Sequence, residues 1–219
     1  MAAGGGAETI VVRREGLQGV GMFLRGQRLI VSIPPSLAAL EAKARMWSPD
    51  AAQNPLPAAG EIGLPVEKIV GPAFVGYSDR SHFRPIEGGA ARVLDPVLDL
   101  PAWEALKAAC DATQWRNGGD SLSAPGAVGV FCGHDLAAFA GYEIWGGTIA
   151  HISIITDPRY RGRGCGKQAV SAITRLALDR GLVPQYRTLD SNTPAIAIAQ
   201  SLGFERYSTT VWIKIPVPQ

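Results

Sequence analysis

The most informative stretch of the sequence is 154-IITDPRYRGRGCGK-167. It starts with apolar, β-branched residues that are typical of a strand, and from Gly166 it runs into good helix formers. Between them stand alternating glycines, Gly162, Gly164 and Gly166. Residues without a Cβ let backbone N–H groups converge on an anion, and a helix that follows adds its own free N–H groups. The stretch therefore predicts a strand, an anion-binding loop and a helix over 166–180.

The charges of this stretch also predict a bound anion. Arg161, Arg163 and Lys167 stand at the start of the expected helix, where a positive charge opposes the helix dipole. Each such charge costs about 0.3–1 kcal/mol unless an anion lies there. A polyanion, such as the phosphates of a cofactor, would remove this cost.

Two common phosphate-binding loops do not fit the spacing. A Walker loop needs a glycine where Arg161 stands and a Ser or Thr where Gln168 stands. A dinucleotide fingerprint needs its first glycine directly after the strand, but residues 156–163 separate Ile155 from Gly164. A nucleotide-dependent enzyme that uses this loop is a minor alternative, which tight NADH binding would support.

The residues around this stretch predict a layered α/β fold. Glycine turns at 133–135 and 146–147 separate three apolar runs, which is the pattern of an antiparallel meander. A helix and a further strand follow the loop, so the sheet becomes mixed through a helical crossover. The expected strands are 91–94, 128–132, 136–145, 148–155, 185–189 and 206–215, and the expected helices are 102–112, 166–180 and a short one after Pro194. The fold class is a mixed, mostly antiparallel central sheet flanked by helices.

The N-terminal part of the chain predicts an extension to this fold. Its expected elements are a flexible leader over 1–7, a hairpin of strands 20–24 and 28–33, a helix 37–46 capped by Ser36, a loop over 48–65 and a strand 68–77. A boundary is expected near 79–90. We therefore expect an N-terminal extension over 1–80 and a second domain, which contains the anion-binding loop, over 81–219.

Composition excludes several classes of protein. The 219 residues are 47% hydrophobic, enough for a core without disulfides, and the net charge of +2 does not imply a nucleic-acid partner. The three cysteines have neither the spacing of a metal site nor the density of a secreted framework, so a cytoplasmic setting fits best. No signal peptide or membrane helix of roughly 20 apolar residues is visible. We expect a cytoplasmic protein without metal, nucleic acid or membrane partners, and a homodimer is compatible with these features.

The loop and a second segment together resemble a known family. Arg161, Gly164 and Gly166 match Arg/Gln-x-x-Gly-x-Gly/Ala, the acyl-CoA-binding motif of the GNAT superfamily of N-acetyltransferases. Pro158 and Tyr160 match the usual approach to that loop. The family's second motif is matched in spacing by Asn192, Ala195, Leu202, Gly203 and Phe204. The resemblance covers about residues 91–215, and two motifs in the right order make it more specific than a lone glycine loop.

The resemblance implies an acyl-CoA site on this segment. Ile154, Ile155 and Thr156 would bind the pantetheine arm through their backbone, and Asn192 would contact it further along. The pyrophosphate would be held by Arg161, Gly162, Arg163, Gly164, Cys165, Gly166 and Lys167. The strands 148–155 and 185–189 would splay apart where the cofactor lies. The implied activity is transfer of an acetyl group from acetyl-CoA to a primary amine of a small molecule or amino acid, by direct attack in a ternary complex.

The sequence offers two candidates for the general base that such a reaction uses. Glu143 and His151 lie on expected strands, although either side chain could equally be a packing or surface group. Many relatives protonate the thiolate with a tyrosine seven residues after the motif's asparagine, a position that is Ala199 here. Ser191, Ser201 or water could replace it. Alternatively, the chain is an acyl-CoA-sensing module without turnover.

Aromatic and acidic residues could both contribute to a binding site for the acceptor amine. An apolar pocket could be lined by Phe139, Tyr142, Trp103, Trp115 and Trp145, and a cationic amine could be attracted by Asp111, Asp120 and Asp135. Aromatic residues at such spacings are often core, and loop carboxylates are often simply solvated. Cys165 has no evident histidine partner, so we expect a packed side chain rather than a nucleophile.

Overall fold

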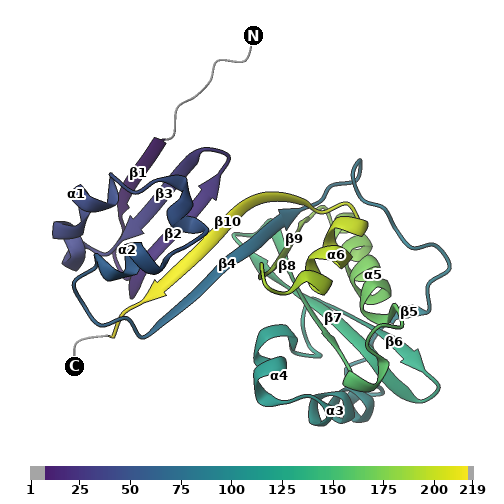
Figure 1. The fold of residues 1–219 in the computed structure, drawn as a ribbon. Helices are drawn as coiled ribbons and strands as arrows, with labels where there is room; N and C mark the ends of the chain where they lie inside the picture. The colour runs from purple at the N-terminus through teal and green to yellow at the C-terminus, as the bar shows by residue number, and fades with distance from the viewer. Residues whose placement is uncertain (1–7, 217–219) are drawn as a thin grey trace. The chain divides into compact units, whose positions relative to one another are not determined.

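The computed structural model describes residues 8–216, which form two compact units (Figure 1). The first unit holds the chain before Gly76, together with Thr188–Thr193 and the part that starts at Arg206. The second unit holds Gly76–Arg187 and Pro194–Glu205. The expected leader over 1–7 lies outside the described residues. None of the helices in the described part is long and apolar enough to span a membrane.

The first unit is a sheet with short helices packed on it. Its strands lie in the order β1-β3-β2-β10-β4, with β1 parallel to β3 and β2 antiparallel to both β3 and β10. The bounds are β1 Glu8–Arg13, β2 Gly19–Arg25, β3 Arg28–Ile33, β4 Lys68–Tyr77 and β10 Glu205–Lys214. The expected hairpin and the expected strand 68–77 are confirmed. Strand β1 was not expected, because its pairing with β3 is a contact between distant residues.

The helices of the first unit correct two expectations. In place of one helix over 37–46, the chain forms a 3-10 helix, Pro35–Leu40, and a short helix α1, Glu41–Ala44. Leu37 has a non-helical conformation and Ser36 makes no cap, since Pro34 takes the capping position. The expected loop over 48–65 contains a 3-10 helix, Pro49–Ala52, and helix α2, Leu56–Gly60. These turns form because their alanines, with Trp47, cover the apolar face of the sheet.

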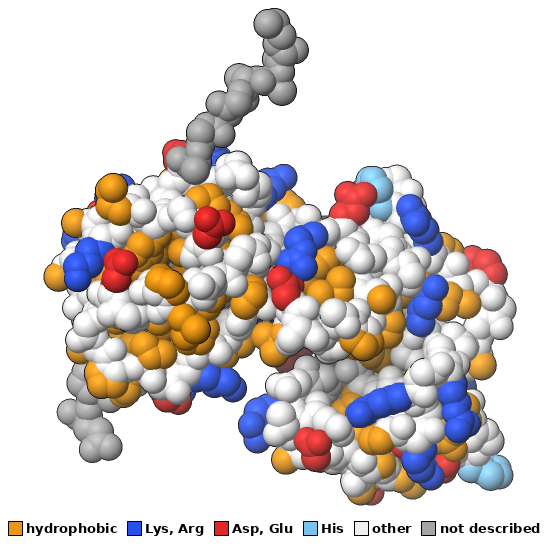
Figure 2. All heavy atoms as spheres, viewed as in Figure 1, with side chains coloured by type: hydrophobic (Ala, Val, Ile, Leu, Met, Phe, Trp, Pro, Cys, Tyr) orange, Lys and Arg blue, Asp and Glu red, His pale blue; other side chains and the backbone are white. Residues whose placement is uncertain are grey.

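The first unit also leaves some apolar surface exposed to solvent. The side chains of Met46 and Leu56 are 84% and 68% accessible. Figure 2 shows apolar side chains gathered on the visible face of this unit. Its core, by contrast, is closed, with Leu29, Val31 and Ile33 of β3 fully buried.

The second unit is built on the expected meander. Its strands lie in the order β9-β8-β7-β6-β5, antiparallel from β5 to β8 and parallel between β8 and β9. The strand bounds are β5 Ala91–Val93, β6 Gly126–Cys132, β7 Asp135–Trp145, β8 Ile149–Thr156 and β9 Val183–Leu189. The helix bounds are α3 Leu100–Ala109, α4 Ala112–Gly118, α5 Cys165–Asp179 and α6 Thr193–Ser201. The expected mixed, mostly antiparallel sheet is confirmed, and α4 is an addition to the expected helices.

The two faces of this sheet carry different helices (Figure 1). Phe139 and Ile155 pack in a core with Leu106 of α3 and Leu122, which follows α4. The neighbour of Ile155, Thr156, faces the other way and lies against Gly166 of α5. Side chains of β8 therefore alternate between an α3–α4 face and an α5 face.

Candidate active site

The loop between β8 and α5 has the conformation that its glycines permit. Gly162 and Gly164 have φ angles of 75° and 81°, in the left-handed region, and a Cβ built on either would meet nothing within 4 Å. Gly164 precedes α5 without a side-chain cap, so no side chain satisfies the first N–H groups of this helix. The loop is thus an open set of backbone donors at a helix N-terminus, which fits a phosphate group.

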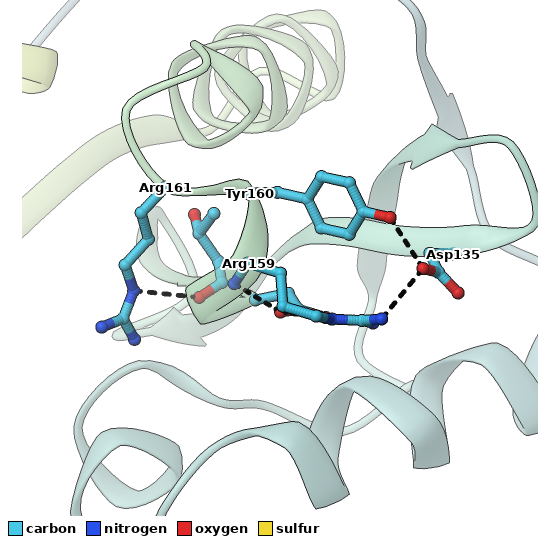
Figure 3. Close-up of polar contacts among 6 residues, drawn as sticks. Asp135, Arg159, Tyr160 and Arg161 are labelled. Atoms are coloured by element: carbon cyan, nitrogen blue, oxygen red, sulfur yellow. Dashed lines mark hydrogen bonds and ion pairs between the residues drawn. The ribbon is translucent and has the colours of Figure 1, made fainter.

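A network of hydrogen bonds and ion pairs among Asp135, Asp157, Arg159 and Tyr160 holds the start of this loop (Figure 3). The Asp157 carboxylate is 1% exposed and accepts hydrogen bonds from the Arg159 guanidinium and the Arg159 N–H. The Arg159 hydrogen bond is the main cause that lowers the pKa of Asp157. Asp135 joins the network, since it lies 3.2 Å from Arg159 and accepts a 2.7 Å hydrogen bond from the Tyr160 hydroxyl. The Arg159 side chain therefore has a structural role, since it pairs with two carboxylates of the protein.

The remaining cations of the loop point elsewhere. Figure 3 shows Arg161 directed away from Asp135, with its Nε 3.4 Å from the Thr156 carbonyl oxygen. Arg163 lies over the Tyr160 ring, 5.4 Å from its centre, and is exposed. Together with Lys167 of the first helical turn, these side chains are placed to approach a bound anion.

The first turn of α5 packs closely against β8. A Cβ on Gly166 would lie 2.8 Å from the Thr156 hydroxyl oxygen, so glycine allows the helix to approach the strand. Cys165 is buried, and its Sγ lies 4.0 Å from the Cys132 Sγ. Burial is the main cause that raises the pKa of the Cys165 thiol. A buried thiol of raised pKa is a packing group, as the sequence indicated.

The strands β8 and β9 are paired over only part of their length. Among the described residues, the ladder runs from Ile149 opposite Val183 to Ile152 opposite Tyr186. Beyond it, β8 continues to Thr156 and β9 to Leu189. The two strands therefore separate just before the loop, as expected for a cofactor that lies between them.

The hydrogen-bond pattern between β7 and β8 determines which backbone groups of β8 face this opening. The Asp157 N–H bonds the Ala137 carbonyl across β7, so the alternation of an antiparallel ladder directs the Ile155 backbone to β7 as well. The N–H and C=O groups of Ile154 and Thr156 then face away from β7. Gly118, the last residue of α4, lies against the Ile154 carbonyl, where a Cβ would clash. Helix α4 therefore borders the opening.

The two candidate bases lie opposite each other on adjacent strands. Glu143 of β7 is the register partner of His151 of β8, so both side chains share the α3–α4 face. The His151 ring stacks on Trp145, with centroids 3.8 Å apart and planes 14° apart. Glu143 accepts a 3.1 Å hydrogen bond from the Trp145 indole N–H. Glu143 thus holds the indole that covers the histidine.

A second pair of residues orients the imidazole of His151. Its Nδ1 lies 2.8 Å from Gln185 Oε1, and Gln185 Nε2 donates a 2.5 Å hydrogen bond to the Tyr77 hydroxyl oxygen. Since the amide oxygen can only accept, the histidine donates from Nδ1 and keeps its lone pair on Nε2. Burial is the main cause that lowers the pKa of His151, while the Gln185 hydrogen bond raises it. At neutral pH the ring is a neutral acceptor at Nε2.

Comparison with known proteins identifies the family. The model of the GNAT acetyltransferase family matches residues 95–204, half of the chain and most of the second unit. The chain belongs to the GNAT acetyltransferase family. It is therefore a GNAT-type acyltransferase, and enzymes of this family use acyl-CoA. A search of curated proteins gives no match.

Solved structures support the GNAT fold. A GNAT-family structure from Novosphingobium aromaticivorans is 26% identical and has a TM-score of 0.53, with 70% of this chain and 68% of that chain covered. A GNAT acetyltransferase from Colwellia psychrerythraea is 17% identical with a TM-score of 0.56, over 74% of this chain and 62% of that chain. A GCN5-related N-acetyltransferase from Kribbella flavida is 17% identical with a TM-score of 0.55, over 87% and 70%. The chain thus spans about two thirds of these relatives.

Within this GNAT fold, most of the aromatic residues named for an acceptor pocket are structural. Phe139 and Tyr142 are fully buried, and the Tyr142 hydroxyl oxygen accepts a hydrogen bond from Arg180. Trp103 of α3 and Trp115 of α4 pack edge to face, with ring centroids 5.2 Å apart, against the core between these helices and the sheet. Trp145 differs, because it is 39% exposed and covers His151.

The acidic residues named for the acceptor amine separate in the same way. Asp111 caps α4 and Asp135 supports the loop. Asp120 accepts a 2.9 Å hydrogen bond from Ser153, which lies on the same face of β8 as His151. It also acts electrostatically on His151, so Asp120 is the acid associated with the candidate base.

Three further residues lie in or next to the second GNAT motif. Asn192 lies between β9 and α6 among residues of the first unit, where its N–H bonds the Leu189 carbonyl. Ala199, at the position of the family's tyrosine, is fully buried in α6. The Ser201 hydroxyl donates to the Ile198 carbonyl, so it is engaged within the helix.

Cavities of measurable volume occur elsewhere in the second unit. One of about 340 Å³ lies between α5 and residues 86–93, and one of about 420 Å³ is lined by residues 78–81 and 181–183. Neither is lined by His151 or by the loop residues 157–167.

Proposed function

We propose that this GNAT acyltransferase moves an acetyl group from acetyl-CoA to a primary amine of a small molecule or amino acid, in a ternary complex. The observation that carries the proposal is the arrangement of His151, whose Nδ1 is held by Gln185 and whose Nε2 lone pair is left for a proton. Family membership supports acyl transfer in general. The histidine supports an acceptor that must lose a proton, as an amine does.

The residues that would hold the cofactor are those at the end of β8 and in the loop. The outward N–H groups of Ile154 and Thr156 would bind the pantetheine arm. The pyrophosphate would lie on the N–H groups of residues 161–167 and near Arg161, Arg163 and Lys167. Acetyl-CoA bound there would supply the acetyl group as an activated thioester.

The role of His151 is to remove a proton from the acceptor. The amine attacks as a neutral nitrogen, and its surplus proton passes to His151 Nε2 as the N–C bond forms and the C–S bond breaks. Gln185 and Tyr77 keep the ring in the tautomer that can accept this proton. Glu143 would act on His151 through Trp145 and its charge, rather than as a second base.

The leaving thiolate needs less assistance than the amine. Ala199 has no proton to donate, and Ser201 donates to Ile198. A thiol has a pKa near 8.5, so the thiolate leaves without a dedicated acid and takes its proton from solvent. The Ala199 position is therefore compatible with turnover.

A direct assay separates this proposal from a module that binds acyl-CoA without turnover. The protein is incubated with acetyl-CoA and a panel of primary amines while free thiol is followed, and products are identified by mass spectrometry. We expect thiol release that depends on both protein and amine. Calorimetric binding of acetyl-CoA with no release above background across the panel would instead support the sensing module.

A further inference from the structure

Arg187 lies on the same face of the sheet as the proposed base. It follows Gln185 by two residues on β9, and alternate residues of a strand point to the same face. Gln185 directs its side chain to His151, so the Arg187 side chain leaves the strand toward the same α3–α4 face. Arg187 is also the first residue of β9 beyond the last pair with β8, Ile152 opposite Tyr186. It therefore stands where the two strands separate.

The guanidinium of Arg187 lacks an anionic partner. Within residues 8–216, no hydrogen bond or ion pair involves its side chain, whereas Arg92, Arg159 and Arg206 each pair with a carboxylate. Burial lowers the pKa of Arg187, although the residue is exposed to solvent. Both observations fit a guanidinium that is partly desolvated by its neighbours and still reached by solvent. An unpaired guanidinium in such a place favours an anion.

Charges of both signs act on His151. Arg187 lowers the pKa of this histidine, while Glu143 and Asp120 raise it, so all three are close enough to interact with the ring. A ligand bound at His151 would therefore lie in the field of two carboxylates and one guanidinium. This set of charges is complementary to a molecule with an ammonium group and a carboxylate.

We infer that the acceptor is an amine that also carries a carboxylate, such as an amino acid, and that Arg187 binds this carboxylate while the amine lies at His151. The inference rests on the proposed acetyl transfer and names its substrate class. The planar guanidinium can hold a carboxylate through two parallel hydrogen bonds, which orients the molecule as well as binding it. Arg187 is thereby a specificity-determining residue. A phosphate of the cofactor is the competing occupant.

The first test compares matched acceptors. Amino acids and their carboxamides, with the same side chains, are assayed with acetyl-CoA on the wild type and on Arg187→Met. For the wild type we expect kcat/KM for the acids to exceed that for the amides by about 10- to 100-fold, the value of one charge-assisted contact. Arg187→Met should remove this preference, so that acids and amides with the same side chain have similar kcat/KM. Arg175→Met, which removes a charge from α5 in an ion pair with Glu87, should keep the preference.

The second test does not depend on catalysis. Binding of the same acids and amides to the protein with CoA is measured by NMR, and CoA affinity is measured by calorimetry for each folded variant. We expect the wild type to bind acids more tightly than amides by a similar factor, and Arg187→Met to bind both weakly with unchanged CoA affinity. The inference is overturned if acids and amides bind equally, if neither binds, or if Arg187→Met weakens CoA binding instead. Acid binding without acetylation would refute the proposed function alone.

Discussion

The cofactor loop and the histidine cluster are built in opposite ways. The loop, residues 157–167, is one continuous segment whose N–H groups face open space because glycines adopt left-handed conformations. The histidine cluster takes Tyr77, Trp145, His151 and Gln185 from four different strands. One region acts through its backbone and the other through side chains held by register.

This difference predicts opposite sensitivities to mutation. Adding a Cβ should damage the loop, while most of its side chains can change with smaller effect. In the cluster, one altered side chain should disturb proton transfer while the cofactor still binds. Binding of CoA and the rate of transfer can therefore be separated experimentally.

The largest effect on CoA affinity is expected at the loop glycine Gly164. Gly164→Val forces a β-branched residue into φ 81°, which costs about 1–2 kcal/mol. It also displaces the N–H groups that would donate to the phosphates, and each hydrogen bond to a charged group contributes about 1.5–3 kcal/mol. We expect CoA affinity, measured by calorimetry, to fall at least about 100-fold. Gly26→Val is the matched control, since Gly26 has φ 58° and open surroundings in the first unit. Equal CoA affinity of the two variants would contradict the proposal that this loop binds the pyrophosphate.

The largest effect on the rate of transfer is expected at His151. His151→Gln keeps a polar side chain but removes the base, so kcat should fall by about 10²–10⁴-fold. The affinity for CoA should stay within about twofold, because no loop residue changes. Single-turnover kinetics and calorimetry measure the two quantities. A variant with wild-type kcat would exclude His151 as the base.

Changes at Gln185 should alter pH dependence more than maximal rate. The wild-type pKa of His151 is lowered, so activity should be lost only as pH falls below about 6.5 and the ring becomes protonated. Gln185→Glu places a carboxylate next to the His151 Nδ1–H and so favours the protonated ring. The acid limb of the pH–activity profile should then shift upward by about one pH unit. Gln185→Leu should lower kcat about tenfold through loss of the tautomer. Histidine NMR of each variant reports the tautomer directly, and an unshifted profile in Gln185→Glu would argue against the contact.

The smallest effect is expected at Cys165, although it lies inside the loop. Its thiol is buried against Cys132 and has a raised pKa, so it should not act as a nucleophile. Cys165→Ala should leave kcat within about twofold and cost about 1 kcal/mol of stability, read from thermal unfolding. Loss of activity in a folded Cys165→Ala protein would reopen a covalent route.

Sequence reasoning was strongest where the signal is local. The meander, the strand–loop–helix segment and the terminal strand were predicted because glycine turns and apolar runs mark them within a few residues. Helix α4 was missed although Asp111 and Gln114 form a capping box at its start, a signal that was available. Strand β1 and the broken helix at Pro35 depend on packing against the first sheet, which no short window reveals.

The candidate site divides in the same manner. The sequence alone determined the conformation of the loop, because its glycines lie within one short segment and their conformational preferences are intrinsic to the residue. Only the tertiary structure decided that Glu143 and His151 share a face and that Gln185 selects the histidine tautomer. It also decided that Arg187, two residues after Gln185 on β9, has no hydrogen-bond or ion-pair partner for its side chain within residues 8–216. Those relations depend on the register of neighbouring strands, and a shift of one residue would turn each side chain to the opposite face.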